Sequence, residues 1–227
     1  MTSEKRKAVA LRIAAIAAEL FYHEGIHGVG VDRIAAKANI TKRTLYRYYP
    51  SKDLLIAAAL RHDLGLRFPR DGTPAQRLIG AFEFMATFLV ENDYRGCPYI
   101  NATAELVNRR HPGRAVVVEA TARRRAWFRN RAVEAGVPDP ELFAEQVDAL
   151  FDGALASATK RADLAPIHAA CAAVKTLLAA SLPGTESFAD LRTSRSRIAR
   201  DEFQGRVTRN ITTSRVRARV INWPWHR

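Results

Sequence analysis

Basic, hydroxyl and phenol side chains gather between residues 41 and 52 in a pattern that could bind nucleic acid. At about 100° per residue, a helix here places Leu45 and Tyr49 on one side and Arg43 and Arg47 on the other. A guanidinium can donate to O6 and N7 of guanine, and amines, hydroxyls and phenols commonly hold phosphates. A solvated basic helix is the alternative interpretation. The candidate DNA-contacting residues are Thr41, Lys42, Arg43, Thr44, Tyr46, Arg47, Tyr48 and Lys52.

A second segment, His23-Glu24-Gly25-Ile26-His27, matches the H-E-x-x-H pattern of zinc peptidases. That chemistry needs both histidines on one face of an unbroken helix, with the glutamate beside a metal-bound water and a third ligand farther along. Gly25 is expected to end the helix between them, and no other histidine stands out as a third ligand. A zinc peptidase is therefore the weaker alternative. The sequence predicts no enzyme activity, no metal and no cofactor.

Composition and charge limit the partners. Thirty-six Lys and Arg oppose 23 Asp and Glu, giving a net charge of +13 and a pI near 10.4, which favours polyanions such as nucleic acid or an anionic membrane surface. The longest apolar run, Leu54 to Leu60, is far shorter than the roughly 20 residues that span a bilayer. Cys97 and Cys171 form no CxxC pair and so predict neither a disulfide framework nor a cysteine zinc site. These features predict a cytoplasmic protein with no membrane partner.

Apolar spacing predicts three short helices in the first 50 residues. The first buries positions between Val9 and Phe21 and ends at Gly25. A second runs from Val31 to Ala38, and a turn follows in which Asn39 tolerates the left-handed conformation. Thr41 caps a third helix that continues through Tyr49. The second and third helices with their short turn are typical of a helix-turn-helix.

Further helices follow, separated by proline and glycine. They are predicted from Ser51 to about Leu66 and at 75–92, 97–109, 113–135, 140–160 and 164–181. No convincing period-two alternation precedes residue 200, so the fold class is all-α. After Pro183 and Gly184 the chain has ten arginines, no lysine and four acids, and its few apolar residues lack a helical period. Residues 184–227 are therefore predicted to be a disordered arginine-rich tail.

The segment from Ala8 to Leu60 carries a specific set of motifs. They are A-x-x-L-F at the end of the first helix, a glycine after it, D-R-I-A-A-K-A in the second helix and T-x-x-T-L-Y-R-Y-Y-P-S-K across the third. Together they closely resemble the DNA-binding domain of TetR-type transcriptional repressors. The resemblance implies a DNA-binding domain at residues 1–50 and a homodimer on double-stranded operator DNA, released by a small-molecule inducer. In two departures, Gly30 replaces a Thr or Ser that caps the second helix and touches a phosphate, and Asn39 replaces the turn glycine.

Residues 51–183 resemble the second, helical domain of the same family. Arg95 to Leu106, RGCPYINATAEL, is similar to the RGC-x-x-x-N-A-x-x-E-L segment of one branch. The resemblance implies a ligand pocket among the central helices and a dimer interface on the last two, with Leu150–Thr159 and Ala169–Leu178 favoured for their small side chains. Aromatic groups and one amide suit such a pocket, although core packing explains them equally well. The candidates are Phe84, Phe88, Tyr99, Asn101, Trp127 and Phe128.

Overall fold

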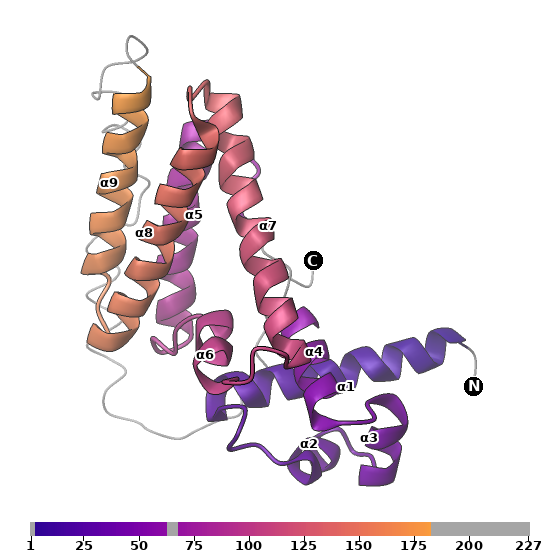
Figure 1. The fold of residues 1–227 in the computed structure, drawn as a ribbon. Helices are drawn as coiled ribbons and strands as arrows, with labels where there is room; N and C mark the ends of the chain where they lie inside the picture. Colours follow the sequence, from indigo (N-terminus) through magenta and orange to yellow (C-terminus); the bar gives the residue numbers. More distant parts are fainter. Residues whose placement is uncertain (1–2, 63–67, 183–227) are drawn as a thin grey trace. The chain divides into compact units, whose positions relative to one another are not determined.

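The computed structural model describes residues 3–62 and 68–182, in which α-helices are the only regular secondary structure (Figure 1). This confirms the all-α class. The predicted tail at 184–227 and the predicted continuation of the fourth helix to Leu66 lie outside the described residues. The helices are α1 (Ser3–Glu24), α2 (Val31–Lys37), α3 (Lys42–Tyr48), α4 (Lys52–His62), α5 (Pro74–Glu91), α6 (Pro98–Glu105), α7 (Pro112–Ala135), α8 (Pro140–Arg161) and α9 (Ala165–Ser181).

Helix α1 ends and helices α2 and α3 begin where the sequence predicted, and α2 and α3 each end one residue before the predicted limit. Helix α1 ends before Gly25, whose φ of +85° is accessible to glycine at little cost. Asn39 takes φ +53° in the turn after α2. At the start of α3, the side chain of Thr41 accepts a hydrogen bond from the amide of Thr44 at 3.1 Å. Local sequence signals therefore account for the whole helix-turn-helix.

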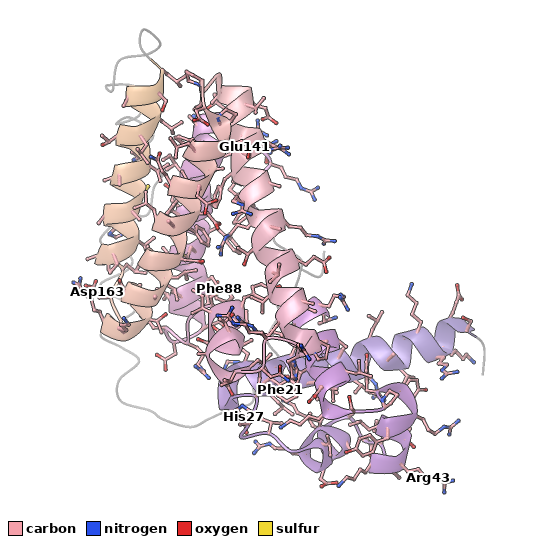
Figure 2. All side chains as sticks on the ribbon, in the orientation of Figure 1. Phe21, His27, Arg43, Phe88, Glu141 and Asp163 are labelled. Carbon is pink, nitrogen blue, oxygen red and sulfur yellow. The ribbon has the colours of Figure 1, made fainter. Side chains whose placement is uncertain are left out.

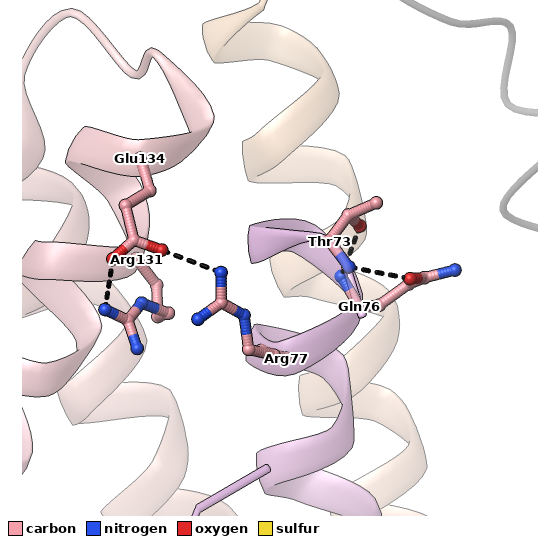
Figure 3. Close-up of polar contacts among 5 residues, drawn as sticks. All are labelled: Thr73, Gln76, Arg77, Arg131 and Glu134. Atoms are coloured by element: carbon pink, nitrogen blue, oxygen red, sulfur yellow. Dashed lines mark hydrogen bonds and ion pairs between the residues drawn. The ribbon is translucent and has the colours of Figure 1, made fainter. Parts of the chain in front are cut away.

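Helix α5 begins at a capping box, shown in Figure 3. Oγ1 of Thr73 accepts from the amide of Gln76 at 3.2 Å, and Oε1 of Gln76 accepts from the amide of Thr73 at 2.8 Å. One turn into the helix, Arg77 pairs with Glu134 of α7 at 2.8 Å, and Arg131 of α7 donates to the same carboxylate. The start of α5 is thereby fixed against the end of α7.

The helix predicted at 97–109 is shorter than the sequence pattern indicated, and α6 ends at Glu105. Leu106 leaves the helical region with φ −89° and ψ 77°. Beyond it, Oδ1 of Asn108 accepts from the amide of Arg110 at 2.9 Å. Such a local side-chain bond offers the backbone an alternative to the helix, which explains the early end. The remaining helices, α5 and α7 to α9, agree with the predicted limits to within one residue.

Helix α4 packs against both α1 and α7, so the N-terminal helices share a hydrophobic core with the helices that follow. Ile13 of α1, Leu55 of α4 and Val116 of α7 are fully buried in it. Helix α8 lies between α7 and α9, and α5 contacts both α7 and α9 (Figure 1). Among the described residues, no helix combines the length and apolar character needed to cross a bilayer.

We expect Gly30→Ser to raise the free energy of unfolding by about 0.5 kcal/mol, because serine can cap the free amides of α2 and glycine cannot. Gly30 has φ −82° and no side-chain cap bond, and a Cβ there would meet no atom within 4 Å. Urea unfolding followed by circular dichroism measures the change.

Gly28→Ser is the matched control. A Cβ on Gly28 would lie 2.7 Å from the carbonyl oxygen of Glu24, so this variant should be less stable than the wild type. A loss of stability in Gly30→Ser as well would contradict the capping argument.

Candidate nucleic-acid interface

Helix α3 presents one face to the core and one to solvent. The side chain of Leu45 is fully buried, whereas those of Arg43, Tyr46 and Arg47 are exposed, and Tyr46 is 38% exposed. Figure 2 shows Arg43 at the outer surface of this helix. Neither arginine forms an ion pair with any residue that the structure describes. Both guanidinium groups are therefore available to an external acceptor.

The start of α3 is held by side chains that were predicted to contact DNA. The hydroxyl of Thr41 caps the helix and lies 2.9 Å from that of half-buried Thr44. Nζ of Lys42 donates to Oδ2 of Asp32 on α2 at 3.0 Å. This hydrogen bond and the charge of Asp32 raise the pKa of Lys42 above its ordinary value. Lys42 therefore joins α2 to α3, and Asp32 competes with any external anion for its ammonium group.

The far end of α3 is anchored to α1. The hydroxyl of Tyr49 donates to the carbonyl oxygen of Ala10 in α1 at 2.8 Å, and burial raises the pKa of this phenol. Tyr48 and Lys52 are half-buried, and the ammonium of Lys52 lies 5.9 Å from the ring centre of Phe21. Tyr49 thus has a structural role, and Lys52 lies at the edge of the exposed face.

The H-E-x-x-H segment does not lie on one helix. His23 and Glu24 form the end of α1, Gly25 breaks it, and His27 lies in the following loop. Glu24 pairs with Arg33 of α2 at 2.8 Å. Burial lowers the pKa of His23. Within residues 3–62 and 68–182, no group of three His, Cys, Asp or Glu side chains is placed to hold a metal ion.

Glu105, a residue that the sequence analysis did not single out, holds the loop between α1 and α2. Its Oε2 accepts from the amide of Ile26 at 2.6 Å and from that of His27 at 3.2 Å. The ring Nε2 of His27 lies 2.9 Å from the backbone carbonyl oxygen of Glu105. A second contact joins the same regions, because the hydroxyl of Tyr22 donates to the carbonyl oxygen of Gly96 at 2.9 Å. The segment around α6 is thus bonded directly to the N-terminal helices.

Three of the six predicted pocket residues have contacts with α4 or with Phe68. Trp127 and buried Phe128 pack against Phe68, with ring centres 4.5 Å and 5.8 Å from it. Tyr99 belongs to the core around α4, and its hydroxyl donates to the carbonyl oxygen of Leu60 at 3.4 Å.

The other three candidates lie on α5 and α6. The ring of Phe88 lies 6.2 Å from that of Tyr22, and Figure 2 shows Phe88 near the α6 end of α5. Nδ2 of Asn101 donates to the carbonyl oxygen of Arg95 at 3.0 Å, and Phe84 is half-buried on α5. Phe88 and Asn101 therefore lie close to the contact between Tyr22 and Gly96.

A helix-turn-helix with an exposed basic recognition helix, followed by a larger helical part, defines a class of DNA-binding regulators. The family profile for bacterial regulatory proteins of the tetR family matches residues 13–59. A crystal structure described as a tetR transcriptional regulator from Streptomyces avermitilis is 32% identical, with a TM-score of 0.66, and the match covers 76% of this chain and 97% of that one. The chain belongs to the TetR family of transcriptional regulators.

Two other relatives are similar over different lengths. A TetR-family regulator from Streptomyces coelicolor is 25% identical with a TM-score of 0.68, and the match covers 80% of this chain and 96% of that one. The helix-turn-helix-type transcriptional repressor SCO4008 of Streptomyces coelicolor is 36% identical over 74 residues, which are 31% of this chain and 38% of the repressor. The chain thus matches just over a third of that repressor's length.

We expect Glu105→Ala to lower the free energy of unfolding by about 1 kcal/mol, because the amides of Ile26 and His27 lose their charged acceptor. Glu105→Gln keeps an acceptor oxygen without the charge and should cost less. Urea unfolding of both variants measures the difference. Equal stability of the alanine variant and the wild type would show that water replaces the carboxylate without loss.

Proposed function

We propose that this chain is a homodimeric repressor that binds operator DNA and is released by a small-molecule inducer. Residues 1–50 are the DNA-binding domain, and residues 51–183 bind the ligand and form the dimer. The observation that carries the proposal is the pair Arg43 and Arg47, exposed and without an ion-pair partner among the described residues, on a helix whose opposite face buries Leu45.

The recognition helix reads the major groove in this proposal. Arg43 and Arg47 donate to guanine O6 and N7, and Tyr46 and Thr44 contact bases or phosphates beside them. Lys42, Tyr48 and Lys52 hold the phosphate backbone, and Thr41 supports the start of the helix. Family membership and the exposed face of α3 support these assignments.

Dimerisation sets the spacing between two recognition helices. Exposed small residues recur along α9 at Ala169, Ala172 and Thr176, and they allow a second helix to approach closely. With the favoured stretch of α8, Leu150–Thr159, they form the proposed interface. Two half-sites on one face of B-DNA lie about 34 Å apart, so a ligand that changes the helix separation changes operator affinity.

An inducer acts only through different affinities for the DNA-bound and free conformations. The contacts of Glu105 with the α1–α2 loop and of Tyr22 with Gly96 supply two routes by which a change near α6 could shift the N-terminal helices. Selection of binding sites from random DNA tests the proposal first. Enrichment of a partly palindromic site supports it, and failure to enrich any site contradicts it.

We expect Arg43→Ala to weaken binding to the selected operator by about 1 to 3 kcal/mol and to relax the preference at one base position, because a bidentate guanine contact is lost. Fluorescence anisotropy with operator and random duplexes measures both effects. Lys52→Ala is the comparison, because loss of a phosphate contact weakens both duplexes equally and reduces the salt dependence. An equal loss on both duplexes in Arg43→Ala would reassign Arg43 to the phosphate backbone.

We expect Asp32→Asn to strengthen binding to operator and random DNA alike by about 2- to 5-fold, because Asp32 no longer competes with the phosphate for the ammonium of Lys42. Glu24→Gln is the matched control, since it removes the same charge but frees Arg33, which is not among the predicted DNA contacts. Anisotropy titrations at one salt concentration compare the two variants. An equal gain in both would indicate a general charge effect and would argue against a phosphate contact by Lys42.

A further inference from the structure

The first half of α1 carries four basic side chains, Lys5, Arg6, Lys7 and Arg12, which together are named the α1 basic patch. All four are exposed, and none forms an ion pair with any residue that the structure describes. Glu4 is the only acid among residues 3–12 of the sequence. The α1 basic patch therefore presents a net positive charge to solvent.

The order of charges along α1 opposes the helix dipole. Lys5 and Arg6 lie in the first turn, where the partial charge of the helix is positive, and Glu24 lies in the last turn, where it is negative. A charge placed against the dipole destabilises a helix. Glu24 is compensated by its ion pair with Arg33 at 2.8 Å, whereas Lys5 and Arg6 have no such partner in the described part of the chain. This arrangement favours an external anion beside the first turn.

Helix α2 does not present comparable free charge. In a helix-turn-helix, the first of the two helices crosses the DNA backbone. The two cations of α2 are both paired with acids of α1, Arg33 with Glu24 at 2.8 Å and Lys37 with Glu19 at 2.9 Å. Gly30, before α2, has no hydroxyl to offer a phosphate. The unpaired cations nearest to α2 and α3 on the preceding helix are those of the α1 basic patch.

The α1 basic patch lies next to the contact that joins α1 to the end of α3. The hydroxyl of Tyr49 donates to the carbonyl oxygen of Ala10 at 2.8 Å, and α1 and the end of α3 pack against one core. At 1.5 Å per residue, Lys7 and Lys5 lie about 5 and 8 Å along α1 from Ala10. Figure 1 shows this half of α1 on the same side of the molecule as α3. The patch is therefore held in a fixed position relative to the recognition helix.

The dimensions of DNA decide which groups the α1 basic patch contacts. The major groove is about 12 Å wide, so phosphate strands border a helix that lies in it. An offset of about 5 to 8 Å from the end of α3 is of the size needed to reach one of these strands. The minor groove is only about 6 Å wide, and a helix about 10 Å across does not enter it. The patch therefore suits phosphates rather than base edges.

We propose that the α1 basic patch binds the phosphate backbone of DNA beside the groove that α3 occupies. The contact is independent of base sequence, and it adds to the affinity that Arg43 and Arg47 make specific. This inference rests on the proposed function, because the DNA is the operator of that repressor.

The full-length variant with Lys5→Gln, Arg6→Gln and Lys7→Gln tests the proposal. Fluorescence anisotropy from about 50 to 200 mM salt compares the selected operator with a random duplex of equal length. Both duplexes should bind at least about 10-fold more weakly at the lowest salt concentration. The slope of log affinity against log salt should become shallower by at least about 1 unit, because each lost phosphate contact releases fewer counterions. An unchanged slope, or a loss confined to the operator, overturns the proposal.

The variant with Arg70→Gln, Arg125→Gln and Arg129→Gln is the matched control, because it removes the same charge far from α3. Arg70 is exposed before α5, and the other two arginines form exposed pairs with glutamates of α8. Figure 2 shows Glu141, the partner of Arg129, at the opposite end of the molecule from Arg43. Salt screens charges beyond about 10 Å, so affinity should change by less than about 2-fold. A loss equal to that of the α1 variant would indicate a general charge effect and would overturn the proposal.

Urea unfolding separates a DNA contact from a structural role. Because Lys5 and Arg6 oppose the helix dipole, their replacement should leave the urea midpoint unchanged or raise it. A lower midpoint would show that these side chains stabilise the fold and would overturn the proposal. If Arg43→Ala weakens operator binding while the α1 variant binds both duplexes like the wild type, the proposed function stands and this surface is wrong. If selection from random DNA enriches no site, the proposed function itself fails.

Discussion

The recognition helix α3 has seven residues, and a helix of this length is not stable alone in water. Its conformation depends on contacts made outside the helix. The side chain of Leu45 is buried in the core, and the hydroxyl of Tyr49 donates to the backbone of α1. The hydroxyl of Thr41 caps the first turn by accepting from the amide of Thr44. Together these contacts fix the rotation of α3 about its axis. That rotation decides that Arg43 and Arg47 face solvent.

Helices α1 to α3 share one hydrophobic core with α4, α6 and α7. Because α1 packs against α4, α1 cannot shift without disturbing these contacts. Two hydrogen-bonded contacts supplement this apolar packing. Glu105 holds the α1–α2 loop, and the hydroxyl of Tyr22 holds the turn at Gly96. Through these contacts α6 and the turn before it are bonded to α1 and to the loop that follows it.

Charge pairing distinguishes the recognition helix α3 from α7. On α7, Arg125 and Arg129 pair with Glu145 and Glu141 of α8 at 2.8 Å and 3.1 Å, and Figure 2 shows Glu141 near the far end of these helices. Such exposed pairs contribute little to stability, but they neutralise the arginines. Arg43 and Arg47 of α3 form no ion pair with any described residue. Their positive charge therefore remains available to a polyanion, whereas Arg125 and Arg129 of α7 are neutralised by glutamates.

The sequence by itself determined the features that depend on a few neighbouring residues. Gly25 and Asn39 predicted the ends of the first two helices and Thr41 predicted the start of the third, because backbone dihedral preferences and side-chain caps act over one turn. Apolar spacing predicted that Leu45 is buried and Arg43 exposed. The early end of α6 was missed, because the turn that the side chain of Asn108 stabilises competes with a helical pattern of similar strength.

Only the tertiary structure decided which distant residues meet. Glu105 bonds to the amides of Ile26 and His27, almost 80 residues earlier, and no pattern in either segment indicates the other. Likewise, Arg124 is one of several arginines on α7, and only the packing of α8 selects it for burial beside two carboxylates. Such contacts follow from how whole helices pack around a shared core. The packing of helices depends on many weak interactions between distant parts of the chain. A short stretch of sequence therefore does not show which distant residues will be in contact.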